Sequence, residues 1–145
     1  MSICYNCNHR HIVFTISDLL WNFFRIDRNL INLLFQAVSI TILSWFKDQS
    51  KKKKLIPGII AILHTYGRDL QWNPHIHAIV TEGAMNDVDV FSKMDFISYD
   101  ALRKRFQKVL LDLLSKKLGK DTFQNIKNKI YLKSDKGFYV YAKKV

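Results

Sequence analysis

The chain has 145 residues, 48% of them hydrophobic, which is enough for one domain with a core and short for two. Lys and Arg number 23 against 12 Asp and Glu, a formal net charge of +11. A small protein this basic usually binds a polyanion, either nucleic acid or an anionic membrane surface. Two cysteines, Cys4 and Cys7, are too few for a disulfide framework and indicate a reducing compartment.

Neither a secretory signal nor a membrane span is predicted. The N-terminus lacks the basic-then-apolar pattern of a signal peptide. The longest apolar stretch, residues 30–46, is interrupted by polar residues and falls short of the roughly 20 clean apolar residues that a span requires. We therefore expect a soluble, cytoplasmic protein with no membrane partner.

The N-terminal third predicts a strand followed by helices. Residues 11–16 (HIVFTI) are rich in β-branched and aromatic side chains, which favour a strand. Ser17 and Asp18 are good helix caps, so a short helix is expected over residues 19–24. Apolar residues at helical spacing predict a long amphipathic helix over residues 28–45.

The middle of the chain predicts a β-hairpin. Pro57-Gly58 is expected to break the chain, and residues 59–65 (IIAILHT) form a continuous apolar run typical of a buried strand. Turn-forming residues occupy both ends of the segment 67–74, and residues 75–81 (HIHAIVT) predict the next strand. The two strands are close enough in sequence to pair as an antiparallel hairpin.

The C-terminal third predicts two helices and a last strand. In chain order we expect an irregular polar segment over 82–98, an amphipathic helix over 99–118 ended by Gly119, a shorter helix over 122–132, a turn at Lys136-Gly137 and a strand over 138–142. The order strand, helix, strand, strand, helix, strand suits an α+β fold. Its simplest form is an antiparallel sheet with helices packed on one face, in a ferredoxin-like arrangement.

The strongest chemical signal is His75-Ile76-His77. Residues two apart on a strand point to the same face, so the two imidazoles can provide half of a divalent metal site. Alone the triplet is a weak motif, and an accidental pair is the alternative. His64 lies across the hairpin, where cross-strand Cβ atoms are ~5 Å apart. We predict His64 as a third ligand; a strand-end histidine that hydrogen-bonds the turn is the alternative.

Several segments resemble one protein family. Residues 64–83 (HTYGRDLQWNPHIHAIVTEG) resemble the signature region of rolling-circle insertion-sequence transposases of the HUH, two-tyrosine class. The segments 9–25 (HRHIVFTISDLLWNFFR), 101–114 (ALRKRFQKVLLDLL) and 136–144 (KGFYVYAKK) are similar to further parts of that family, in the family's order. The triplet is short, but the block around it is specific, and nearly the whole chain is covered.

The resemblance implies an HUH endonuclease core that nicks and rejoins single-stranded DNA during DNA transposition. In the family, the two histidines and a third polar ligand hold Mg²⁺ or Mn²⁺. The metal polarises the scissile phosphate, and a tyrosine attacks to give a 5′-phosphotyrosine and a free 3′-OH. A cation lowers this barrier by offsetting charge on the phosphate oxygens. A site built only from histidines also suits Zn²⁺, so the metal identity stays open.

Two departures from the family bear on activity. The family's catalytic tyrosines lie on a helix after the strand that here ends at Lys144. We therefore expect residues 9–145 to be a truncated HUH core that is inactive alone, with no catalytic nucleophile. Tyr139 and Tyr141 match strand residues of the family and are expected to pack on the sheet.

The second departure is at the N-terminus. Cys4 and Cys7 have the spacing of half a zinc knuckle, and His9 and His11 are potential further ligands. That arrangement is too cramped for a standard finger. Residues 1–8 are accordingly interpreted as a remnant of the family's N-terminal zinc-binding region.

Other polar and aromatic residues are candidates for contacts with DNA or with the histidines. The predicted DNA-binding residues are Lys51, Lys52, Lys53, Lys54, Arg68, Trp72, Asn73, Arg103 and Arg105. The lysine run would contact phosphates without reading sequence, or form a solvated linker. Trp72 would stack on an unpaired base or be buried against the sheet, and the two helical arginines would face DNA or solvent. Asp69 and Glu82 are candidate hydrogen-bond partners of the histidines.

The principal hypothesis is a transposase-derived domain that binds single-stranded DNA and one divalent metal ion. A non-enzymatic nucleic-acid-binding α+β module is the alternative, with Phe138, Tyr139 and Tyr141 as stacking residues. A metal-dependent hydrolase that uses bound water in place of tyrosine ranks last, because no general base is evident.

Overall fold

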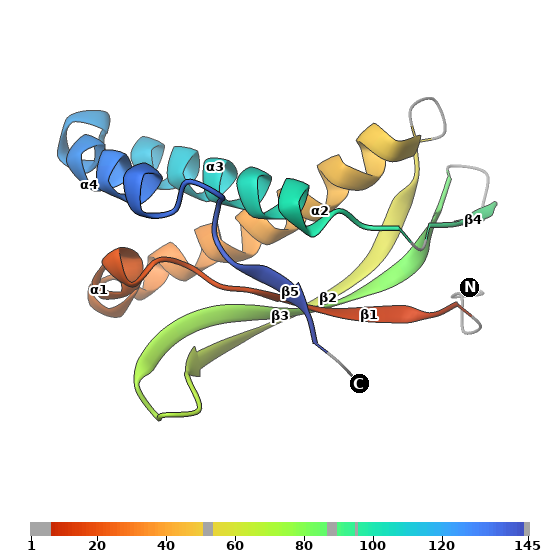
Figure 1. Ribbon diagram of the computed structural model, residues 1–145, viewed down its shortest axis with the longest axis horizontal. Helices are drawn as coiled ribbons and strands as arrows, with labels where there is room; N and C mark the ends of the chain where they lie inside the picture. The colour runs from red at the N-terminus through yellow and green to blue at the C-terminus, as the bar shows by residue number, and fades with distance from the viewer. Residues whose placement is uncertain (1–6, 51–53, 87–89, 95, 144–145) are drawn as a thin grey trace.

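The computed structural model describes residues 7–50, 54–86, 90–94 and 96–143 (Figure 1). In chain order its elements are β1 (His9–Phe14), η1 (Asp18–Leu20), α1 (Trp21–Ile26), η2 (Arg28–Leu30), α2 (Ile31–Ser50), β2 (Ile56–Tyr66), β3 (Trp72–Met85), β4 (Phe91–Lys93), α3 (Tyr99–Leu118), α4 (Lys120–Lys133) and β5 (Val140–Ala142). The strands pair antiparallel in the order β2-β3-β1-β5, and β4 pairs with the far end of β3. The predicted α+β class is confirmed.

The helices cover one face of the sheet, as predicted (Figure 1). Along β3, the buried residues Pro74, Ile76, Ala78 and Val80 alternate with more exposed neighbours. This is the period of a strand with one face against a core. Ile76 packs into a single cluster with Phe14 of β1 and Phe106 of α3, and the last two rings meet edge-to-face at 5.1 Å. The core therefore fills the space between sheet and helices.

We call the opposite side of the sheet the open face. The strand registers place three rows of side chains across it, which are His64 and His75, then Ile62, His77, Val13 and Tyr141, then Ile60, Ile79 and His11. Val13 is only 1% exposed although it lies outside the core cluster under the helices, so neighbours on the open face cover it. The open face carries the candidate site.

Local signals explain the helix ends. Ser17 accepts a hydrogen bond from the Leu19 N–H and so caps η1, and Ser98 caps α3 by accepting from the Ala101 N–H. Gly119 ends α3 with a φ of +96°, a conformation that favours glycine. The prediction of a helix over residues 99–118 ended by Gly119 is confirmed.

Three expectations for the strands were wrong in detail. Pro57 and Gly58 do not break the chain, because β2 is an edge strand that tolerates proline and has a register shift at this point. β2 is buried on one side only, with Ile60 63% and Ile62 51% exposed on the open face. The segment after residue 81 is less irregular than expected, because β3 continues to Met85 and pairs with β4.

Helix α2 carries much of the core. By length and composition alone, the helical stretch Arg28–Ser50 could cross a membrane, because its most apolar 18-residue window has a mean hydropathy of 1.5. The estimate that this stretch falls short of a span was therefore wrong. Half of its most apolar window is buried within the protein, including Leu34 and Val38. A core helix passes the same test, and here the apolar side of α2 packs against β2, β3 and α3.

Candidate metal centre and nucleic-acid surface

Three histidines come together on the open face at the end of the β2–β3 hairpin. His64 pairs directly with His75, and His77 lies two residues further along β3 on the same face. One potential ligand nitrogen from each ring lies within 4.8 Å of the others. The ring centroids are 3.9 Å apart for His64 and His77 and 5.0 Å apart for His75 and His77. The three residues predicted as ligands thus form one cluster.

Hydrogen bonds orient both rings of the HxH triplet. The Nδ1 atom of His75 lies 2.6 Å from the backbone carbonyl oxygen of Asn73, to which it donates. The Nδ1 atom of His77 lies 2.7 Å from Nε2 of His11 on β1. An imidazole whose Nδ1 donates a proton keeps its lone pair on Nε2, where a metal can bind. His11 was not predicted as part of this cluster.

Burial keeps His77 and its neighbour His11 uncharged at neutral pH. It is the largest cause that lowers the pKa of His77 to about 4, and the neighbouring charges of His64, His75, His11 and Lys143 lower it further. Burial also lowers the pKa of His11, followed by the charges of Lys143 and His64. Neutral imidazole is the form that coordinates a metal. His77 is therefore in its metal-binding form at neutral pH.

The donor set fits a divalent transition metal. Nitrogen ligands of one ion with metal–nitrogen bonds of about 2.0–2.1 Å lie closer to one another than the spacing seen here, so the rings must move together slightly on binding. His64 is exposed near the end of its strand, which leaves it free to do so. Three imidazoles suit Zn²⁺ better than Mg²⁺ or Mn²⁺, which prefer oxygen ligands.

A cavity of about 390 Å³ opens beside the histidines. Besides the three rings, its lining consists of Thr15, Tyr66, Gly67, Arg68, Asn73, Tyr141 and Lys143. Arg68 and Asn73 were predicted near the site and are brought to it. Tyr141 was expected only to pack on the sheet; it stacks on Tyr139 at 5.0 Å and also faces the cavity. Arg68 and Lys143 give the cavity positive charge.

The two carboxylates predicted beside the histidines have other partners. Asp69 accepts a hydrogen bond from the Gln71 N–H within the hairpin loop. Glu82 follows the open-face residue Thr81, so it points to the opposite side of β3, where its carboxylate lies 3.1 Å from the Arg10 guanidinium. Among the described residues, neither carboxylate lines the cavity. The structure therefore does not bring these two residues to the site.

Trp72 packs toward the helices. Its Nε1 donates to the Trp21 carbonyl oxygen at 2.9 Å, and the guanidinium of Arg28 lies 4.8 Å from the centre of its ring. Of the two alternatives that the sequence left open, the side chain takes the packed one. The exposed aromatic ring at the cavity is instead Tyr66, 58% exposed and packed edge-on to Trp72.

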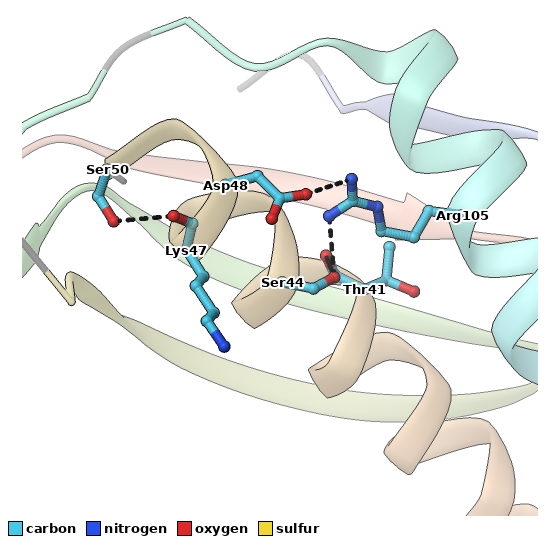
Figure 2. Close-up of polar contacts among 6 residues, drawn as sticks. All are labelled: Thr41, Ser44, Lys47, Asp48, Ser50 and Arg105. Atoms are coloured by element: carbon cyan, nitrogen blue, oxygen red, sulfur yellow. Dashed lines mark hydrogen bonds and ion pairs between the residues drawn. The ribbon is translucent and has the colours of Figure 1, made fainter. Parts of the chain in front are cut away.

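The side chains of the two helical arginines form hydrogen bonds to other elements of the protein. Arg105 donates to Ser44 Oγ at 3.0 Å and to Asp48 at 2.7 Å, tying α3 to α2 (Figure 2). Arg103 donates to the Val140 carbonyl oxygen at 3.1 Å and lies over the Tyr139 ring. Neither reaches the histidine cavity in the part of the chain that the structure describes.

Lys54, the one residue of the predicted lysine run that the structure describes, is also distant from the histidines. Lys54 is exposed just before β2, whereas His64 is ten residues along, roughly 30 Å away for an extended strand. Lys51, Lys52 and Lys53, like Cys4, lie outside the described residues. Thr15 and Lys143 were missed because their approach depends on strand order, which no local pattern reveals. Tyr66 could have been found, because it lies two residues after His64 on β2 and side chains two apart on a strand share a face.

Fold and site together define an α+β domain with a histidine centre and positive charge on an open sheet face. Residues 58–145 match the model of the family Y2_Tnp, described as "Putative transposase". Over 109 residues, 75% of this chain and 25% of the relative, the sequence is 36% identical to the transposase for insertion sequence element IS801 of Pseudomonas savastanoi pv. phaseolicola. No solved structure matches it significantly.

The chain belongs to the Y2_Tnp transposase family, which confirms the resemblance seen in the sequence. It spans a quarter of the length of the curated relative that it matches.

Proposed function

We propose that this chain binds single-stranded DNA on the open face of its sheet and holds one divalent metal ion between His64, His75 and His77. The observation that carries the proposal is the orientation of the triplet, in which other groups engage Nδ1 of both rings and leave Nε2 available. Because the chain belongs to a transposase family, we propose that it serves transposition and that it is cytoplasmic. Nicking and rejoining of strands would be the chemistry of the full-length family, and we propose that this chain is inactive alone.

A bound metal would polarise a phosphate and offset the negative charge that develops on its oxygens during attack. The chain's own residues hold the phosphate there. Arg68 and Lys143 supply positive charge at the cavity, and the Asn73 amide offers a neutral donor. His64, His75 and His77 would hold the ion through their ring nitrogens. Of Mg²⁺, Mn²⁺ and Zn²⁺, the zinc ion fits a set of three imidazoles best.

The shape of the cavity favours a single strand over a duplex. A volume of about 390 Å³ is that of a pocket for a small-molecule-sized group, such as one nucleotide. The exposed ring of Tyr66 beside the histidines offers a surface on which an unpaired base can stack. A paired base inside a duplex presents no free ring face to it.

Metal titration tests the centre. Calorimetry with Mn²⁺ should give one site per wild-type chain and at least a tenfold loss of affinity in the His75→Ala/His77→Ala protein. His9→Ala is the matched control, because His9 is an exposed histidine further along the open face, paired with Thr81. Equal Mn²⁺ binding by the wild type and the double variant would remove the metal centre and leave a nucleic-acid-binding module.

Fluorescence anisotropy with labelled oligonucleotides tests the DNA surface. Arg68→Ala should weaken binding evenly across sequences and reduce the salt slope for single-stranded DNA by about 0.7, the value for one lost phosphate contact. Arg105→Gln is the control, since that side chain is engaged with α2. An Arg68→Ala protein that binds with unchanged affinity and slope would contradict the proposed surface.

A nicking assay tests whether this chain supplies a nucleophile. The two tyrosines that line the cavity are held against other rings, Tyr66 against Trp72 and Tyr141 against Tyr139. We therefore expect no covalent adduct between this chain and a single-stranded oligonucleotide in the presence of Mn²⁺. An adduct that survives denaturation, and disappears in Tyr66→Phe or Tyr141→Phe, would show the opposite.

A further inference from the structure

The two histidines of the triplet receive their Nδ1 partners in different ways. His75 uses the carbonyl oxygen of Asn73, two residues earlier on its own strand. His77 has a partner 66 positions away in the sequence, because Nε2 of His11 on the neighbouring strand β1 lies 2.7 Å from its Nδ1. The second contact exists only because β1 pairs with β3 in this register.

His11 stands beside the three clustered histidines rather than among them. In the strand register His11 is opposite Ile79 and diagonal to His77. An aromatic side chain is long enough to contact a diagonal neighbour on the adjacent strand. The two rings are 4.9 Å apart and inclined by 53°. The set of nitrogens within 4.8 Å of one another comprises His64, His75 and His77, without His11.

We propose that His11 is a positioning residue for the metal centre. Its Nε2 accepts the Nδ1 proton of His77 and so holds that ring in the tautomer, and at the angle, that present Nε2 to the cation. The inference rests on the proposed metal site. It adds a residue from outside the hairpin whose contact with the metal is indirect.

The tautomer argument gives His11 a chemical role. A neutral imidazole carries one proton, and with that proton on Nε2 the His77 ring has no lone pair on the side away from His11. A proton acceptor at Nδ1 favours the other tautomer, which frees Nε2 for the metal. His11 accepts in this way when its own proton is on Nδ1, and the backbone of β1 is tied on its other side because the Lys143 N–H donates to the His11 carbonyl oxygen at 2.7 Å.

Substitution separates hydrogen bonding from packing. His11→Leu fills the space without an acceptor, whereas the side-chain oxygen of His11→Gln can accept the Nδ1 proton of His77. We expect His11→Leu to weaken Mn²⁺ binding by about 10- to 100-fold, the range for loss of such partners, and His11→Gln to stay within a few fold of the wild type. His9→Leu and His9→Gln are matched controls on the same strand and face, expected to bind like the wild type.

The tautomer can be measured directly on the wild-type protein, whatever the stability of the variants. With ¹⁵N-labelled histidine and diamagnetic Zn²⁺, NMR should show His77 coordinated through Nε2 with its proton on Nδ1. Coordination of His77 through Nδ1 overturns the proposal, as does His11→Leu with wild-type Mn²⁺ affinity. Those results leave the metal site itself standing, whereas a wild type that binds no metal overturns the site and the positioning role together.

Discussion

Gly137 lies between α4 and β5, and its backbone approaches the backbone of α3 closely. The variant Gly137→Ala tests how much this close approach matters for stability. Gly137 has a φ of +92°, a conformation that side chains with a Cβ rarely adopt. A Cβ at this position would lie 2.5 Å from the Arg103 carbonyl oxygen and 2.7 Å from the Lys104 nitrogen. Both are backbone atoms of α3 and cannot rotate away. β5, which brings Tyr141 to the cavity, would have to shift.

The expected loss of stability has two parts. Forcing a residue with a Cβ into the left-handed region costs about 1–2 kcal/mol. Overpacking against a rigid neighbour adds about 1–3 kcal/mol, so the total is about 2–5 kcal/mol. For a domain of this size, each 1 kcal/mol lowers Tm by roughly 2–4 °C, so a loss near 3 kcal/mol corresponds to roughly 6–12 °C.

Gly119→Ala is the matched control. Gly119 also has a positive φ, +96°, but a Cβ there would meet only Thr122 Oγ1 at 3.7 Å, an ordinary van der Waals contact. It should therefore lose the backbone part alone, about 1–3 kcal/mol for a φ of +96° with a ψ of +133°. Urea unfolding followed by far-UV circular dichroism measures both variants. Equal losses would refute the reasoning that the close approach to α3 matters.

Three further variants test the helix layer. Phe106→Ala should cost about 3–5 kcal/mol by urea unfolding, because this fully buried ring packs against Phe14; a loss below 1 kcal/mol would contradict the packing. Arg105→Gln should lower stability by only about 0.2–1 kcal/mol and leave DNA affinity unchanged; weaker DNA binding would return Arg105 to the DNA surface. Burial by itself raises the pKa of Asp112, but hydrogen bonds from Lys108 and Lys127 outweigh it and hold that pKa below 3.8. A carboxylate with a lowered folded-state pKa stabilises the fold above its unfolded-state pKa, so the Tm difference between wild type and Asp112→Asn should shrink from about pH 5 toward pH 2; a constant difference would contradict this.

The sequence by itself determined the parts of the protein that depend on neighbours along the chain. Helical periodicity followed by a glycine predicted where α3 begins and ends. Two apolar runs on either side of a turn predicted the β2–β3 hairpin. Strand alternation put His75 and His77 on one face, and the short hairpin brought His64 opposite them. These predictions succeeded because each rests on contacts between residues close in sequence, which local patterns encode.

Only the tertiary structure decided which distant segments share a surface. The pairing of β1 with both β3 and β5 puts His11 beside His77 and brings Tyr141 and Lys143 to the cavity. Glu82 was misplaced because β3 runs on to Met85, so alternation along that strand turns its side chain away from the open face and toward Arg10. The sequence of a strand shows which of its faces is apolar. Its partner strands and its register depend on how all the elements pack into one core, and that information is spread over the whole chain.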